Sequence, residues 1–374
     1  MTPLRPLLAA TAAIGALLAA SPSGAVQFVV TNLVSNGPIA AAHHDAAMVN
    51  PWGLASSATG PFWTSDNGTG LSTLYNGAGV KQVLTVTIPG PGGAASTPTG
   101  VVFNGTASAF AIGGTKPVFI FDTQDGTLAG WAPAFGTSAA LAPTATPDAI
   151  YTGLALGEGA GGPSLFAADF HSGGVNVFDS NYALTGALHD PTLAPGYAPF
   201  NVQVLNGELF VAYAKQDDDR EDEVAGAGLG YVDVFNLDGS FNRRIASAGD
   251  ALNAPWGLAI APSSFGSLAG SLLVGNFGDG TISAFDPLSG AFRGVLRGTD
   301  EQPLVIDGLW ALRLGNGGNG GDARKIYFTA GPEDETQGLL GSLTAVPEPQ
   351  TWAIMILGLG LMGGALRTRR AQAV

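Results

Sequence analysis

The sequence predicts an all-β protein and, within that class, a six-bladed β-propeller. Three observations support this: a turn-rich composition, a unit of about fifty residues that recurs six times, and a similar order of short strands in each unit. Only 12% of the 374 residues are charged, whereas 56 are Gly and 24 are Pro. This composition suits short strands joined by tight turns. A recurring unit of this length with three or four strands is typical of a propeller blade.

Each unit opens with a short apolar strand. Residues 51–55 and 255–259 both read Pro-Trp-Gly-Leu-Ala, which is the clearest internal repeat in the chain. Four weaker copies of this opening are residues 99–102, 152–155, 199–202 and 307–310. A β-sandwich would lack a fifty-residue period and a β-helix would have a much shorter one, so the repeat favours a propeller.

Two more strands are expected in each unit. The expected second strands are residues 62–66, 109–113, 165–169, 209–213, 272–276 and 326–330. The expected third strands end on an aromatic residue followed by Asp or Asn, and the aromatics are Tyr75, Phe121, Phe178, Phe235 and Phe285. A sixth, degenerate copy at 338–344 has Leu343 in this place. Residues 27–34 also alternate like a strand, and we expect them to pair with the last blade and close the ring.

The first 25 residues have the features of a secretion signal. Arg5 precedes an apolar run over residues 6–20, and Ser23 and Ala25 are small residues where a signal peptidase would read the chain. We therefore expect cleavage after Ala25 and export through the inner membrane. The expected domain order is a signal peptide at 1–25, a propeller at 26–346 and a sorting segment at 347–374.

The C-terminal segment combines three features in a fixed order: a short acidic proline motif, an apolar stretch over residues 352–366 and a basic cluster. The residues of the motif and the cluster are Pro347, Glu348, Pro349, Arg367, Arg369 and Arg370. Fifteen helical residues span about 22 Å, which is short for a bilayer core of about 30 Å. The arginines fit the positive-inside rule and would leave the bulk of the protein outside the cytoplasm.

This tail resembles the PEP-CTERM sorting signal. The resemblance implies recognition, and processing, by an exosortase-type enzyme in bacteria that make extracellular polysaccharide. It also implies a protein that is anchored in the membrane or released to the cell surface or matrix.

Residues 28–346 resemble an uncharacterised bacterial family of exported propeller-like proteins that often carry such tails. The resemblance rests on residues 31–35 (Thr-Asn-Leu-Val-Ser), 49–54 (Val-Asn-Pro-Trp-Gly-Leu) and 62–70. The family implies no activity. The blades are more distantly similar to NHL-type and gluconolactonase-type propellers, and no motif of this chain is close enough to carry over a catalytic residue.

The charge and composition limit the partners. The signal contributes one positive charge and the tail a net two, so the region between them carries −17, against −14 for the whole chain. A field of that sign repels phosphate backbones, which argues against a nucleic-acid partner. The chain has no Cys, so disulfides and thiolate chemistry are excluded.

Polar residues after the second strands are candidates for a ligand site, because ligands of propellers usually bind at one mouth of the central channel. These channel-mouth candidates are Asp66, Asn67, Asp169, His171, Tyr213, Lys215, Asn276, Asp279 and Glu333. Asp169 and His171 are two residues apart and would face the same way on a strand. Loops also face water, which would explain the same polarity without any ligand.

The densest charge is the run Asp217-Asp218-Asp219-Arg220-Glu221-Asp222-Glu223. Its carboxylates Asp217, Asp218, Asp219 and Glu221 are candidate calcium ligands, because Ca²⁺ binds six to eight oxygens. The run lacks the spacing of an EF-hand loop, and such runs are often simply solvated. Calcium is the one cofactor that the sequence suggests.

The sequence shows no catalytic constellation: the four His lack metal-ligand spacing, and there is no Gly-x-Ser-x-Gly motif. This favours a non-catalytic binding or scaffold protein of the cell envelope or extracellular matrix, with a polysaccharide or another surface protein as partner. The alternative is a metal-dependent hydrolase or lactonase of gluconolactonase-like type. It would need an ion in the channel held by Glu, Asn and Asp.

Overall fold

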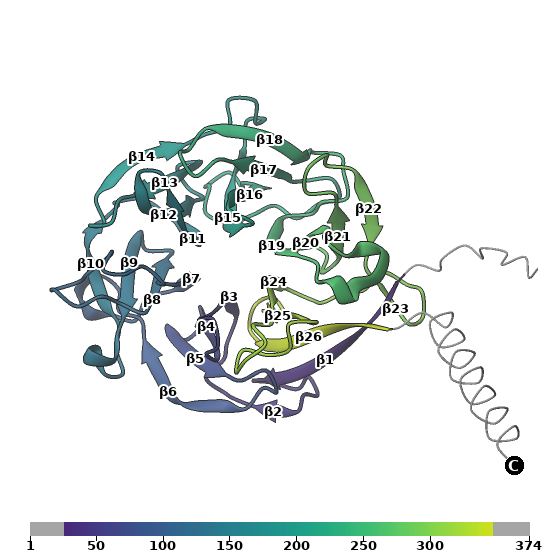
Figure 1. The fold of residues 1–374 in the computed structure, drawn as a ribbon, viewed down its shortest axis with the longest axis horizontal. Coiled ribbons are helices and arrows are strands. Elements are labelled where there is room, and N and C mark those ends of the chain that lie inside the picture. Colours follow the sequence, from purple (N-terminus) through teal and green to yellow (C-terminus); the bar gives the residue numbers. More distant parts are fainter. Residues whose placement is uncertain (1–25, 347–374) are drawn as a thin grey trace, which may run out of the picture.

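The computed structural model of the protein describes residues 26–346, which form a ring of six β-sheets around a central axis (Figure 1). The predicted signal peptide (1–25) and sorting segment (347–374) lie outside the described residues. No helix among residues 26–346 is long and apolar enough to cross a membrane. The six-bladed propeller predicted from the sequence is confirmed.

Each blade has four antiparallel strands, of which the first lies nearest the axis and the last at the rim. Blade one contains β3 (Pro51–Ser56), β4 (Phe62–Asp66), β5 (Leu71–Tyr75) and β6 (Lys81–Thr87). Blade two contains β7 (Pro98–Phe103), β8 (Phe119–Thr123), β9 (Thr127–Trp131) and β10 (Ala140–Ala145). Blade three contains β11 (Tyr151–Gly159), β12 (Gly162–Asp169), β13 (Gly174–Phe178) and β14 (Leu184–Leu188).

The second half of the ring repeats this plan. Blade four contains β15 (Tyr197–Leu205), β16 (Glu208–Lys215), β17 (Tyr231–Phe235) and β18 (Phe241–Ala246). Blade five contains β19 (Pro255–Ile260), β20 (Leu272–Asn276), β21 (Ile282–Phe285) and β22 (Phe292–Val295). Blade six contains β24 (Leu309–Leu314), β25 (Ile326–Ala330), β26 (Leu339–Val346) and β1 (Gln27–Ser35), with the short strands β2 (His43–His44) and β23 (Arg297–Gly298) beside β1. Within residues 26–346, three short 3-10 helices lie in loops: η1 (Pro91–Gly93), η2 (Pro133–Phe135) and η3 (Ser263–Leu268).

The ring closes through β1, as the sequence predicted. This strand comes from the N-terminal end of the described chain and pairs with β26 from its C-terminal end, from Gln27 with Val346 to Ser35 with Leu339. Figure 1 shows the purple β1 beside the yellow β26. The pairing gives hydrogen-bond partners to the backbone groups at the outer edge of β26. Without β1, these groups would be open to pairing with another chain. It also brings the two ends of the described chain together.

The blades differ from the sequence expectation at one place. In blade two, residues 109–113 form part of a loop and no strand, and the second strand is β8, which the sequence pattern had placed third. The third strand is β9, and Trp131 pairs with Phe119 as Phe178 pairs with Leu165 in blade three. Trp131 is therefore the closing aromatic of blade two, and the assignment of Phe121 to that place was wrong.

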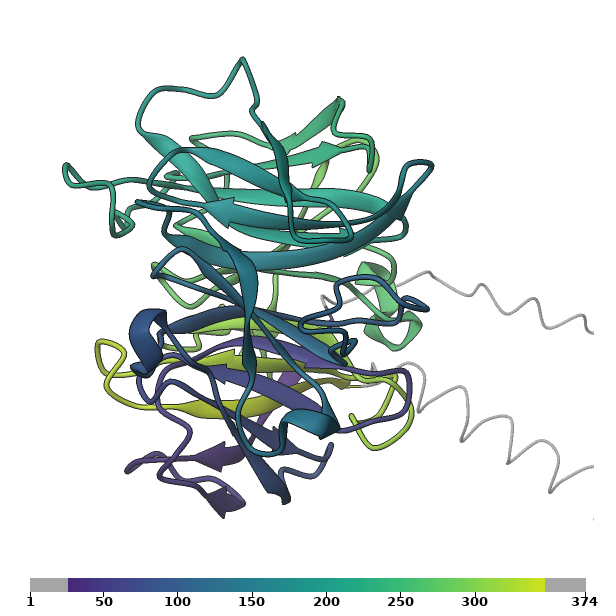
Figure 2. The same cartoon turned by 90° about the vertical axis from the view of Figure 1, so that its left-hand side faces the viewer.

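The strands run across the ring from one side to the other (Figure 2), so the loops collect on two faces. We call the side from which the innermost strands start the entry face. It includes the turns between second and third strands, which are residues 67–70, 124–126, 170–173, 216–230, 277–281 and 331–338. The opposite side, where the innermost strands end, is the exit face. The paired residues Gln27 and Val346 lie on the exit side of blade six, because β26 runs parallel to β24 and ends there.

Close packing of the innermost strands explains their recurring glycine. A Cβ atom on Gly53 would lie 2.5 Å from the carbonyl oxygen of Thr99, and one on Gly100 would lie 2.3 Å from the amide nitrogen of Leu154. Both contacts are with backbone of the next blade. Neighbouring innermost strands can therefore approach this closely only without a side chain.

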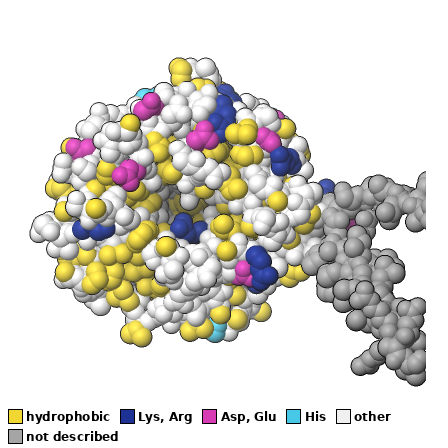
Figure 3. Space-filling view, in the orientation of Figure 1, with side chains coloured by type: hydrophobic (Ala, Val, Ile, Leu, Met, Phe, Trp, Pro, Cys, Tyr) yellow, Lys and Arg dark blue, Asp and Glu magenta, His cyan; other side chains and the backbone are white. Residues whose placement is uncertain are grey.

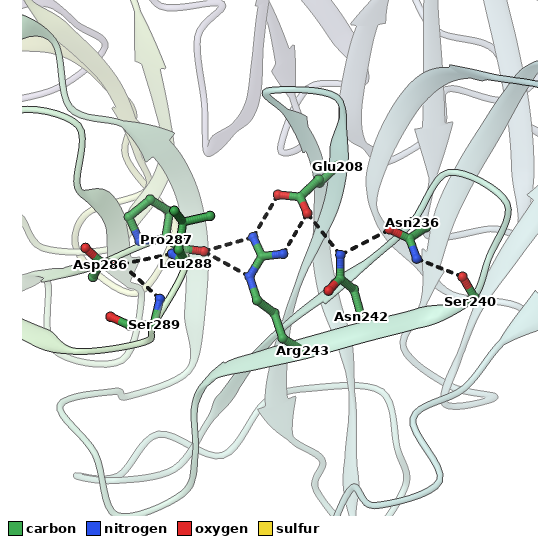
Figure 4. A network of polar contacts seen from close by, with 9 residues as sticks. All are labelled: Glu208, Asn236, Ser240, Asn242, Arg243, Asp286, Pro287, Leu288 and Ser289. Carbon is green, nitrogen blue, oxygen red and sulfur yellow. Dashed lines mark hydrogen bonds and ion pairs between the residues drawn. The ribbon is translucent and has the colours of Figure 1, made fainter.

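Polar contacts also join neighbouring blades at the outer rim. In Figure 4, Arg243 of β18 forms a two-pronged ion pair with Glu208, with nitrogen–oxygen distances of 2.6 and 2.7 Å. The same guanidinium donates to the carbonyl oxygen of Pro287 in blade five at 2.9 and 3.1 Å. One half-buried arginine thus links blades four and five on the exit side, in the geometry that favours arginine over lysine.

Candidate functional site

A cavity of about 210 Å³ lies on the ring axis and is lined by residues of all six innermost strands. Figure 3 shows a hollow at the centre of one face, with dark-blue atoms of a basic side chain inside it. Arg313 is the basic residue that lines this cavity. Its other polar side chains are Ser56, Asn201 and Gln203. The remaining lining is mostly aliphatic.

An aromatic cluster packs around the axis towards the entry face. Its members stand at the start of the innermost strands or in the entry-face turn of blade five, and they are Trp52, Phe200, Trp256, Trp310 and Phe277. The ring centroids of Trp310 and Phe277 are 4.1 Å apart in a stacked pair, and Trp256 meets Trp310 edge-on at 5.7 Å. Because these indoles are almost fully buried, they fill the axis on this side and leave the cavity towards the exit face.

Arg313 is the most unusual group of the cavity. Its Nε and Nη2 atoms donate to the hydroxyl and carbonyl oxygens of Ser56 at 3.4 and 3.3 Å, which are long hydrogen bonds. No carboxylate within residues 26–346 forms an ion pair with it, whereas Arg243, Arg244 and Arg324 each have at least one. Burial lowers the pKa of Arg313 to about 10, which reflects the cost of a cation removed from water.

The other polar residues of the cavity differ in whether their side chains already form hydrogen bonds within the protein. Asn201 donates to the carbonyl oxygen of Trp256 at 2.8 Å and so links blades four and five next to the axis. The side chain of Gln203 lines the cavity and has no hydrogen-bond partner in the described part of the chain. The amide of Gln203 and the hydroxyl of Ser56 are therefore available to a ligand that contacts Arg313.

The channel-mouth candidates from the sequence lie on the entry face, on the other side of the aromatic cluster from the cavity. Asp66 is fully buried at the end of β4 and accepts a hydrogen bond from Thr73 at 2.7 Å. Asn67 donates to Gln124 of blade two at 2.9 Å. Asp169 accepts from the amides of Ile150 at 3.2 Å and Ser172 at 3.1 Å, and it has no hydrogen bond with His171 in the described chain.

The remaining candidates on that face behave similarly. Tyr213 is buried, and Lys215 and Glu333 are exposed. Asn276 and Asp279 both form hydrogen bonds with Thr281 and Asn253. These bonds hold the turn between β20 and β21 of blade five. The structure does not gather these side chains around the cavity. Asp169, Asn276 and Asp279 hold turns, whereas the Nδ1 atom of His171 and the hydroxyl of Tyr213 are buried without a hydrogen-bond partner in residues 26–346.

The proposed calcium residues lie in the long entry-face loop of blade four. Asp218, Asp219 and Glu221 are exposed, and the carboxylate of Asp217 caps the amide of Glu221 at 3.0 Å. Among the described residues, no group of three His, Cys, Asp or Glu is placed to hold a metal. The last residue of the run, Glu223, is mostly buried. Burial and the nearby carboxylate of Glu335 raise the pKa of Glu223 to about 8.

The fold and the C-terminal motif define the class of the protein: a six-bladed β-propeller that carries a sorting signal. The PEP-CTERM protein-sorting motif matches residues 345–370, which confirms the resemblance of the tail to this signal. The solved structure of virginiamycin B lyase from Staphylococcus aureus covers 86% of this chain and 100% of its own, with a TM-score of 0.51. The two are 10% identical, so this likeness shows the fold alone.

Relatives at higher identity define the family. The uncharacterised protein R648 of Acanthamoeba polyphaga mimivirus is 34% identical over 329 residues, which cover 84% of this chain and 79% of the relative. Protein L690 of the same virus is 32% identical over 338 residues, with 84% and 85% covered. The chain belongs to the family of these two proteins.

Proposed function

We propose that this protein is an exported, surface-associated binding protein whose propeller presents a ligand site at the cell envelope. The observation that carries the proposal is the position of the sorting motif. It begins at Ala345, near the end of β26, so the sorting motif follows directly on the last strand of the described chain. An exosortase-type enzyme is the processing partner that such a motif implies.

The geometry of the ends supports attachment without loss of binding surface. Gln27 and Val346 are paired residues in the two outer strands of blade six. Neither residue is among those that line the axial cavity. We propose that the axial cavity and the entry face are the surfaces that bind a partner. We propose a polysaccharide or another surface protein as that partner.

Fractionation of cells that contain an exosortase tests this proposal. The full-length chain and a chain ending at Val346 would be expressed in parallel and followed by immunoblot in cytoplasmic, membrane, surface and medium fractions. We expect the full-length chain at the membrane or surface and the shortened chain released as soluble exported protein. A full-length chain found in the cytoplasm, or a shortened chain that stays with the membrane, would contradict the proposal.

A control separates sorting from folding. Glu348→Ala with Pro349→Ala changes the motif and leaves all residues of the ring intact. If the motif directs sorting, this variant should follow the shortened chain in the fractions.

A further inference from the structure

We propose that the axial cavity binds a small oxyanion, a carboxylate or phosphate group on a ligand about the size of one sugar unit, and that Arg313 holds that group. The inference rests on the proposed binding function and names the ligand class of its site. It is carried by a partly buried guanidinium that has no ion-pair partner among residues 26–346 and opens onto a cavity.

The first argument is the cost of the unpaired cation. A charge taken out of water is strongly unfavourable unless an opposite charge and hydrogen bonds compensate for it. The chain meets this requirement elsewhere, because Arg244 lies between the carboxylates of Asp233 and Asp190. Arg313 has only the two long contacts with Ser56. A bound oxyanion would supply the missing charge in the two-pronged geometry that a guanidinium favours.

The second argument is the shape and chemistry of the cavity. Its volume of about 210 Å³ lies below the roughly 300 to 1,000 Å³ of pockets for drug-sized ligands, so it suits a smaller molecule. Ser56 and Gln203 provide a hydroxyl and an amide that can bind ligand hydroxyl groups. Aliphatic residues of the innermost strands, such as Leu154 and Leu258, form the remaining walls. A sugar acid has this combination of one anionic group, several hydroxyls and a compact apolar ring face.

The third argument concerns access. The acidic residues that give the domain its negative charge are concentrated in entry-face loops, chiefly residues 217–223 and 333–335. The exit-face loops carry the basic residues Lys116, Arg324 and Lys325 besides scattered acidic residues such as Asp179, Asp238 and Asp322, so they have no comparable acidic cluster. The aromatic cluster closes the axis towards the acidic face. An anion would therefore reach Arg313 from the exit face, where repulsion is weakest.

Calorimetric titration of the purified full-length chain in a mild non-ionic detergent tests the site. The probes are sodium D-galacturonate, inorganic phosphate and, as a neutral control, D-galactose, all in a buffer without other oxyanions. We expect one molecule of an anionic probe to bind per chain and no heat from galactose. Binding of galacturonate alone would assign the group to a carboxylate, and binding of phosphate alone would assign it to a phosphoryl group.

Matched variants identify the residue. Arg313→Gln should raise the dissociation constant at least tenfold, whereas Arg324→Gln, on the same face but exposed and paired with Asp322, should leave it unchanged. The melting temperature of ligand-free Arg313→Gln should equal or exceed that of the unsubstituted chain, because a partly buried charge without an ion-pair partner is removed. A purely structural arginine would lower it instead.

Three results would overturn the inference: no binding of either anion to the unsubstituted chain, unchanged binding in Arg313→Gln, or a marked loss of stability in that variant. None of them affects the proposed surface location, because fractionation does not depend on Arg313. Conversely, a failure of the fractionation experiment would leave the titration results intact.

Discussion

Trp52 of blade one and Trp310 of blade six stack with ring centroids 3.6 Å apart and planes 19° from parallel. The indole nitrogen of Trp310 also donates to the side-chain oxygen of Asn50 at 2.9 Å. These residues come from the first and the last blade of the ring. The ring is therefore closed twice, at the rim by the pairing of β1 with β26 and at the axis by the two indoles.

Replacement of Trp310 by Ala should destabilise the protein by about 3 to 5 kcal/mol, the usual cost of removing a large buried aromatic side chain. Trp310 is fully buried, and its loss would also leave Asn50 without that partner. Chemical denaturation measures the change in the free energy of unfolding. Leu288→Ala is the control, because Leu288 is 75% exposed and should change stability by less than about 0.5 kcal/mol. Equal effects of the two substitutions would mean that the indole stack does not close the ring.

The closing aromatics of blades two and three should be equally important for stability. Phe178→Ala and Trp131→Ala should each cost about 3 to 5 kcal/mol, because both side chains are buried at the same register of their blades. Phe292→Ala serves as the control, since that ring is 53% exposed. A loss below about 1 kcal/mol for Phe178→Ala would show that the aromatic register is wrong.

Blade two shows why the fold could be predicted and one register could not. The fifty-residue period and the repeated opening sequence were enough to predict six blades. Both reflect the fact that the innermost strand of every blade must pack against its neighbours in the same way. The loop before β8 contains Phe110, which is fully buried and packs against Tyr182 at 5.5 Å. An apolar loop of this kind has the composition of a strand. Sequence pattern alone therefore placed one strand too many before Phe121.

The axial cavity could not be predicted for a different reason. The pairing of every innermost strand with its neighbour shifts register near its start, as between Leu309 and Leu312 in β24. A bulge changes the side to which the following residues point, so alternation no longer tells which side chain faces the axis. Arg313 follows such a shift. An arginine in an otherwise apolar strand, Leu309–Leu314, was the available signal.

Stability should fall as the pH rises from about 4 to about 7. Burial raises the pKa of both Asp66 and Asp122 to about 7, against about 4 in an unfolded chain. Between these values the folded state binds more protons than the unfolded state, so each rise in pH favours unfolding. The slope is up to about 1.4 kcal/mol per pH unit for each carboxyl, and it ends above pH 7. Denaturation curves from pH 4.5 to 8 would measure it.

Asp122→Asn separates this effect from the general repulsion of a negatively charged domain. Asp122 accepts hydrogen bonds through Oδ1 from Thr99 and Gly100, and its other oxygen is buried without a partner. An amide keeps the acceptor and has no charge, so the variant should be less dependent on pH and more stable than the unsubstituted chain at pH 8. An unchanged slope would show that Asp122 is ionised in the folded protein throughout this range. Asp125→Asn, in the neighbouring turn, is the matched control.

Residues 26–346 should fold as a single cooperative unit without the segments on either side. All six blades lie within this span, and β1 supplies the outer strand of the last blade from inside it. The sequence of the sorting segment does not follow the fifty-residue repeat of the blades, so its removal should not remove a strand from the propeller. Circular dichroism of the 26–346 fragment should be dominated by β-structure, and its thermal transition should coincide with the loss of tryptophan fluorescence from the axial cluster.

A second fragment that begins at residue 36 lacks β1 and exposes the edge of β26, so it should aggregate or melt at a lower temperature. If the shorter fragment were as stable as the longer one, pairing of β1 with β26 would not be what closes the ring.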